Sequence, residues 1–150
     1  MKKNHLRRNI SNIFVFFFFV LIAFLCMRFE LLNEERFLRS DHLDILTINS
    51  IFAGFLFTSL GIMVSFSDKK AIANKDKNGY MDKYYNSIYV GLLFLIISIL
   101  FAVIGFAFPQ ADNLSWYLTL EQLTLIGGII YFIKSCWSIL KIIQSIRSSL

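Results

Sequence analysis

Glu121 and Lys134 are the two charged residues of the otherwise uncharged stretch from Trp116 to Leu140. Charged groups inside a membrane-spanning segment are costly, and by default they are candidates for an ion or proton path. The two residues are about 20 Å apart along a helix axis, so they cannot pair within one helix. The favoured interpretation places Glu121 at headgroup level and lets Lys134 snorkel to the opposite surface. The alternative is that both line a pore or ion path.

No other set of residues in the sequence has the spacing of a known catalytic or metal site. The sequence has no phosphate loop, no nucleophile elbow, no HExxH motif and no paired intramembrane carboxylates. Cys26 and Cys136 lie in separate apolar runs without CxxC or Cys/His spacing, so we expect neither a disulfide nor a zinc site. His42 lies between Asp41 and Asp44 without further ligands in a metal-binding pattern. We therefore expect no enzyme activity, no cofactor and no metal.

The composition indicates a membrane protein. Of 150 residues, 57% are hydrophobic and only 17% are charged, whereas soluble domains carry about 25% charged residues. The mean hydropathy is +0.63, and 17 phenylalanines lie mainly in uncharged runs. A soluble single-core enzyme and a nucleic-acid-binding protein are both poor explanations, despite a net charge of +5.

Four apolar stretches reach the roughly 20 residues that cross a bilayer core. We predict spans at about residues 10–29, 45–67, 86–108 and 116–140. The basic N-terminus resembles that of a signal peptide, but Cys26–Glu30 offers no cleavage site, so the first span is expected to be retained. Residues 30–44 mix charges with leucines, which predicts an amphipathic segment on the outer surface. The predicted fold is an all-α integral membrane four-helix bundle, with residues 1–150 as a single membrane domain.

The distribution of Lys and Arg predicts the orientation. Four precede the first span, five lie in residues 68–83 and three follow from Lys134 onward, whereas three lie in residues 28–44. By the positive-inside rule, both termini and the 68–83 loop are cytoplasmic, and we expect a multi-pass protein of the inner membrane. The five loop lysines are candidates for docking lipid headgroups or a cytosolic protein partner; they are Lys69, Lys70, Lys75, Lys77 and Lys83. No direct contact with nucleic acid is expected.

The second and third spans each carry a stripe of small residues at helical spacing. The stripes consist of Thr47, Ser50, Gly54, Thr58, Gly61 and Ser65 in the second span and Ser87, Gly91, Ser98, Ala102 and Gly105 in the third. Membrane helices use such stripes for close packing, because lipid supplies no hydrophobic force between helices. The favoured interpretation is that the stripes pack against each other in one bundle. Alternatively, one of them faces a second subunit or lines a water-accessible path.

The stretch NSIFAGFLFTSLGIMVSFSD (residues 49–68), followed by NGYMDKYY (78–85), resembles small multi-span proteins of bacterial antiphage loci. It is most similar to the membrane subunit of the Kiwa antiphage system, and next to CRISPR-accessory membrane proteins. The resemblance covers about residues 45–105, rests on a general pattern and carries over no catalytic residues. It implies an oligomeric inner-membrane component that senses membrane perturbation or depolarises the cell, together with a cytosolic partner of the 68–83 loop.

Three functions follow as expectations. The first is a non-enzymatic inner-membrane protein, a homo-oligomeric scaffold, sensor or membrane-perturbing effector in antiviral defence. The second is a small ion channel or transporter that uses Glu121 and Lys134. The third is a holin or an immunity protein, which a lysis or toxin-protection assay would identify.

Overall fold

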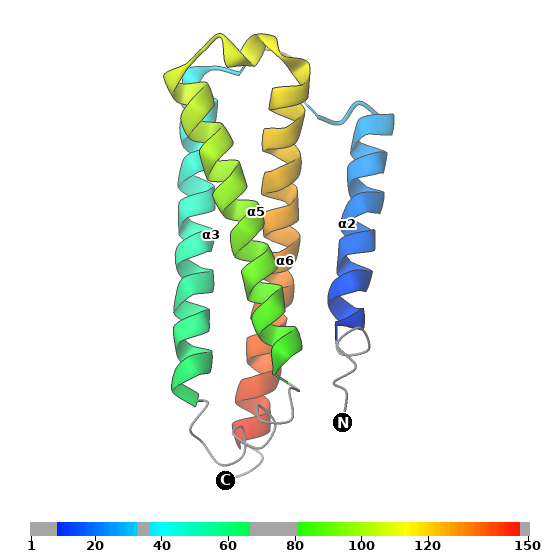
Figure 1. The fold of residues 1–150 in the computed structure, drawn as a ribbon, viewed down its shortest axis with the longest axis vertical. Coiled ribbons are helices and arrows are strands. Elements are labelled where there is room, and N and C mark those ends of the chain that lie inside the picture. The colour runs from blue at the N-terminus through cyan, green and yellow to red at the C-terminus, as the bar shows by residue number, and fades with distance from the viewer. Residues whose placement is uncertain (1–8, 33–36, 67–80, 148–150) are drawn as a thin grey trace.

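The computed structural model describes residues 9–32, 37–66 and 81–147. The regular structure of these residues is helical: α2 (Ile10–Arg28), α3 (Arg39–Phe66), α5 (Asp82–Ala107), the short 3-10 helix η1 (Ala111–Asn113) and α6 (Ser115–Arg147). Consecutive long helices run in opposite directions (Figure 1). The start of α2 and the end of α6 therefore lie at the same end of the bundle, here called the Arg147 end. The opposite end, where η1 joins α5 to α6, is the η1 end.

Each of the four long helices has the length and apolar composition needed to cross a membrane. They contain 19, 28, 26 and 33 residues, and a helix of about 20 residues spans the ~30 Å apolar core of a bilayer. These are the features of a multi-pass membrane protein with an all-helical bundle, as the sequence predicts.

The helix bounds differ from the predicted spans mainly in α3 and α6. α3 begins at Arg39, so residues 39–44 of the predicted amphipathic segment are continuous with this helix. The backbone N–H of Leu38 donates to Asp41 Oδ2 at 2.8 Å, which satisfies a group near the helix start that has no partner in the helix itself. This cap allows α3 to begin before the long apolar run. α6 continues past the predicted end at residue 140 to Arg147.

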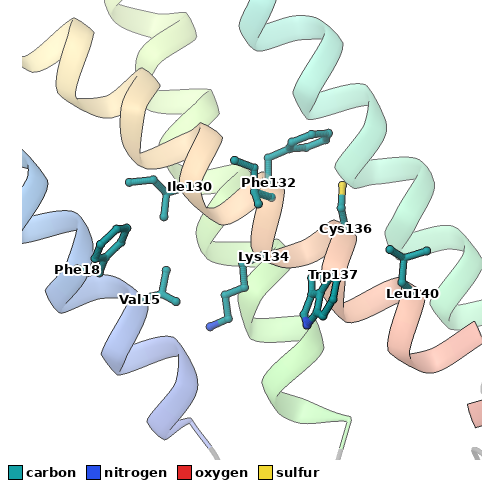
Figure 2. Close-up of a pocket in the computed structure, with 9 residues that line it drawn as sticks. Val15, Phe18, Ile130, Phe132, Lys134, Cys136, Trp137 and Leu140 are labelled. Carbon is teal, nitrogen blue, oxygen red and sulfur yellow. The ribbon is translucent and has the colours of Figure 1, made fainter. Parts of the chain in front are cut away.

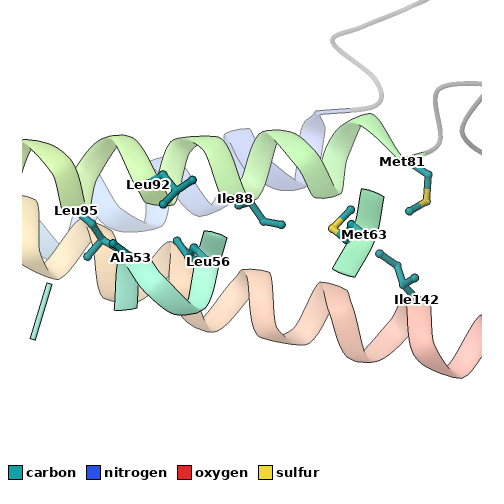
Figure 3. Packing of buried hydrophobic residues seen from close by; sticks show 8 residues of the cluster. All are labelled: Ala53, Leu56, Met63, Met81, Ile88, Leu92, Leu95 and Ile142. Carbon is teal, nitrogen blue, oxygen red and sulfur yellow. The ribbon is translucent and has the colours of Figure 1, made fainter. Parts of the chain in front are cut away.

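α3, α5 and α6 form the packed core of the described structure. Buried apolar side chains from these helices point into the same space in Figure 3, among them Leu56 of α3 and Ile88 and Leu95 of α5. Gly91 of α5 allows the close approach, because a Cβ there would lie 2.9 Å from Leu56 Cδ1 and 3.2 Å from Tyr131 Cβ. Small residues thus bring α5 near both neighbours, the packing mode expected inside a membrane.

α2 packs on the outside of this core, beside α6 (Figure 1). Of the residues in α2, only Asn12 and Ala23 are buried. Phe19 meets Phe94 of α5 edge to face, with 5.0 Å between ring centroids, whereas Phe14 and many other large side chains of α2 are exposed. α2 therefore has little apolar contact with the rest of the bundle.

Candidate functional site

The small-residue stripe of α5 is buried, whereas that of α3 is exposed. Ser87, Gly91, Ser98, Ala102 and Gly105 all lie in the core. Thr47, Ser50, Gly54, Thr58, Gly61 and Ser65 are all exposed. The interpretation that the two stripes pack against each other is therefore wrong. α5 uses its small residues to receive large side chains of its neighbours, such as Leu56 at Gly91.

α3 faces the core with a different set of residues, namely His42, Ile45, Asn49, Ala53, Leu56, Ser59 and Met63. At about 100° per residue, the exposed stripe lies about 150° around the helix axis from this core face. α3 therefore turns this stripe of small residues away from the core, together with large exposed side chains such as Phe55 and Phe57. We call the exposed stripe the outward face of α3.

The outward face of α3 has no unsatisfied hydroxyl and no steric obstruction. Thr47, Ser50 and Thr58 donate to the carbonyl oxygens of the residues four positions earlier, at 2.8, 2.8 and 2.9 Å. A Cβ built at Gly54 or Gly61 would meet nothing within 4 Å. Because its polar groups are satisfied within the helix, this face can lie against lipid or against another helix.

A His–Glu pair is buried at the η1 end of the core. His42 Nδ1 lies 3.0 Å from Glu121 Oε1, and the side chains are 1% and 0% exposed. The pair joins α3 to α6. α5 makes room for it through Gly105, where a Cβ would come within 2.4 Å of His42 Cε1. Glu121 is thus buried in the core of the bundle, where its carboxylate pairs with His42.

Further polar groups extend this pair across all three core helices. Asn49 Nδ2 donates to Ser98 Oγ at 2.8 Å, and the Ser98 hydroxyl donates to the backbone oxygen of Glu121 at 3.4 Å. Together with His42 these residues form the η1-end polar cluster. These hydrogen bonds link α3, α5 and α6 at the η1 end, whereas the buried Asn49 Oδ1 accepts no hydrogen bond from the described residues.

The chemistry available at the η1-end polar cluster is that of an imidazole beside a carboxylate, which can share or exchange a proton. Among the described residues, no three His, Cys, Asp or Glu side chains are grouped so as to hold a metal ion. Sequence reasoning missed the His42–Glu121 pair. The spacing of His42, Ile45 and Asn49 could have indicated it, because these residues lie on one helical face. That face extends the core side of α3 to positions before residue 45.

Lys134 has its partner at the other end of the bundle. Its Nζ donates to Asn12 Oδ1 of α2. Asn12 in turn donates from Nδ2 to the backbone oxygen of Lys83 at 3.0 Å, and its own backbone oxygen accepts from the Tyr131 hydroxyl at 3.1 Å. Lys134 is half-buried and connects α2 to the core.

The structure places Glu121 and Lys134 in two separate sites of α6. Between them, Gly127 and Gly128 pack closely against Phe94 and Leu95 of α5. The two ionisable groups therefore have different partners at opposite ends of the bundle and are not brought together.

The remaining predicted site residues are divided between described and undescribed parts of the chain. Lys69, Lys70, Lys75 and Lys77 lie outside the described residues, and Lys83 is the second residue of α5. Cys26 and Cys136 are free thiols, half-buried in α2 and α6.

Comparison of the chain with protein-family models, with curated proteins and with solved structures finds no match.

Proposed function

We propose that the chain is a non-enzymatic protein of the bacterial inner membrane that acts as a homo-oligomeric scaffold, with the outward face of α3 as its self-association surface. One observation carries the proposal: six small or hydroxyl-bearing residues of α3 are exposed directly opposite the face that packs into the core. In lipid, a bulky side chain gains little from moving out of the acyl chains into a protein contact. Small residues instead let two helix backbones approach closely.

The spacing within this face matches close helix pairing. Ser50, Gly54 and Thr58 follow each other at intervals of four, and so do Gly61 and Ser65. This is the small-xxx-small pattern of membrane helix dimers. The η1-end polar cluster also supports self-association through this face. Its hydrogen bonds hold α3 at a fixed rotation about the helix axis, with the small residues directed outward.

The biological setting that fits such a scaffold is antiphage defence, in which an assembled membrane component senses or perturbs the membrane and acts with a cytosolic protein. This part of the proposal rests on the resemblance of residues 45–105 to membrane proteins of defence loci. Cells that carry the gene with its neighbouring genes should resist phage infection, and the Gly54→Leu variant should lose that resistance. Equal phage sensitivity with and without the genes would exclude this setting.

The assembly proposal is tested by the mass of the purified protein in lipid nanodiscs. Wild type should give a defined oligomer, and Gly54→Leu and Gly61→Leu should each shift it towards monomer. Val20→Phe, which adds bulk to an exposed position of α2, serves as the control and should leave the mass unchanged. A monomeric wild type, or an oligomer unchanged in both glycine variants, would exclude this surface.

The channel alternative is separated from the scaffold by ion flux across liposomes. If ions pass along Glu121 and Lys134, the Lys134→Ala variant should abolish ion flux. If the protein is a scaffold, neither wild type nor Lys134→Ala should give ion flux. Their separate partners, His42 and Asn12, favour the scaffold. The holin and immunity alternatives predict cell lysis and toxin protection, respectively.

A further inference from the structure

A polar pocket lies at the Arg147 end, where α2, α5 and α6 meet. Its volume is about 110 Å³, and Lys83, Lys134 and Lys141 all line it together with Ser11 and Ser138. Since a water molecule takes up about 30 Å³, the pocket has room for one group of the size of a phosphate. The described residues that line it include no carboxylate.

The three lysines give this pocket a strong preference for an anion. Lys83 Nζ lies 4.8 Å from the ring centroid of Tyr84, and Lys141 Nζ lies 5.6 Å from that of Trp137, so aromatic faces hold both ammonium groups near the pocket. Lys134 gives one hydrogen bond to Asn12, and an ammonium group has three N–H donors. Like charges that share a small volume repel each other, and a bound anion would relieve this repulsion.

An apolar groove of about 630 Å³ adjoins the polar pocket and shares Lys134 and Trp137 with it. Val15 and Phe18 of α2 lie on one side of this groove and Ile130 of α6 on the other, with the Lys134 ammonium directed between the two helices (Figure 2). Its volume falls within the range of ligand-binding pockets, about 300–1,000 Å³. The combined site therefore has a cationic part and an apolar part that meet at two residues, which suits an amphipathic ligand.

We propose that this two-part site binds one anionic phospholipid, with its phosphate among Lys83, Lys134 and Lys141 and an acyl chain along Val15 and Phe18. Basic pockets between membrane helices on the cytoplasmic side suit such headgroups, and the predicted orientation places the Arg147 end on that side. The acyl chain of the bound lipid would also occupy the space between α2 and α6, which make little apolar contact with each other. This site involves helices other than α3, so it is independent of the assembly proposal.

The test is native mass spectrometry of the full-length protein in detergent, with phosphatidylglycerol, phosphatidylcholine or inorganic phosphate added in separate titrations. Phosphatidylglycerol should be retained at one per chain, and phosphatidylcholine much more weakly. The double variant Lys83→Gln/Lys141→Gln should lower phosphatidylglycerol affinity about thirty-fold, given the usual contribution of lysines beside a membrane. Arg147→Gln removes one charge at the same end outside the pocket and should change the affinity less than twofold.

A second pair of variants tests the apolar part. Val15→Trp narrows the groove and should lower phosphatidylglycerol retention at least fivefold, whereas Val20→Trp on the exposed side of α2 should not. Equal retention of both lipids, or unchanged affinity in the lysine variant, would overturn the proposal. The proposal would also be overturned by two results together: inorganic phosphate binds with the same dependence on the lysines, and Val15→Trp leaves phosphatidylglycerol retention unchanged. The site would then bind free anions and not a lipid. Nanodisc mass measured on the same variants distinguishes this outcome from a failure of assembly.

Discussion

At the scale of single residues, the His42–Glu121 pair is the contact with the largest expected effect on stability. Both side chains are fully buried and lie 3.0 Å apart, so removing one partner leaves a polar group in the apolar interior. The pair also connects the first turns of α3 to α6 across Gly105. Its main structural effect is to set the register of these two helices at the η1 end.

We expect Glu121→Ala to destabilise the bundle by roughly 1–3 kcal/mol, because the His42 ring loses its buried partner. Glu121→Gln retains an oxygen that can accept from Nδ1 and should recover most of this loss. Thermal unfolding in detergent measures both variants. A double-mutant cycle with His42→Ala should give a coupling of about 0.6–1.7 kcal/mol, as for other membrane hydrogen bonds. A coupling of zero would show that the pair does not contribute to stability.

Two glycines provide a matched comparison of the packing. Gly105→Ala should destabilise by about 1–3 kcal/mol, because the new methyl group overlaps the His42 ring. In monomeric protein, Gly54→Ala meets nothing within 4 Å of its own chain and should be neutral or stabilising by up to about 1 kcal/mol through helix propensity. Unfolding midpoints of the two variants check this. If both variants were equally stable, the close approach of His42 to α5 would be refuted.

At the scale of helices, the four long elements are held by different forces. α3, α5 and α6 share a buried apolar cluster and a buried polar cluster. α2 is tied to them mainly through Asn12, which lies at one end of the helix. A helix attached at one end can separate from its neighbours at the other at little cost, so α2 is the element that we expect to open first.

Asn12→Ala should therefore loosen α2 without unfolding the core. The substitution removes the acceptor of Lys134 and the donor to the Lys83 carbonyl. Spin labels placed on α2 and α6 should show a broader distance distribution by electron–electron double resonance, while a pair on α3 and α5 stays unchanged. Phe14→Ala, at a largely exposed position of the same helix, is the control. An unchanged α2–α6 distribution in Asn12→Ala would mean that apolar contacts are sufficient to hold α2.

At the scale of the whole molecule, the antiparallel order of four membrane-length helices places the start of α2 and the end of α6 at the same end. The lysines of the pocket lie at this end too. The distribution of positive charge predicts that this end is cytoplasmic, and the proposed lipid site requires an anionic leaflet there.

This orientation predicts which cysteines a membrane-impermeant thiol reagent can reach. In a background with Cys26 and Cys136 replaced by alanine, Gln110→Cys at the η1 end should be labelled from the outside of intact cells. Arg147→Cys should be labelled only after the membrane is permeabilised. The reverse pattern would invert the orientation, and labelling of both positions from outside would show that α6 does not cross the membrane.

The sequence by itself determined the number of helices long and apolar enough to cross a membrane, and their approximate bounds, because length and apolar composition need no tertiary contact. An even number of alternating helices also determined that the start of the first helix and the end of the last lie at the same end of the bundle. The small-residue stripes were visible as well, since helical periodicity is a local property.

Only the tertiary structure decided which face of each helix meets which neighbour. Periodicity reveals that α3 has a stripe of small residues, but it does not reveal that Leu56 and His42 pack inward while Gly54 lies outward. The partners of Glu121 and Lys134 depend in the same way on helices that are distant in sequence. In a membrane the lipid is as apolar as the core, so hydrophobicity alone cannot tell the two faces apart.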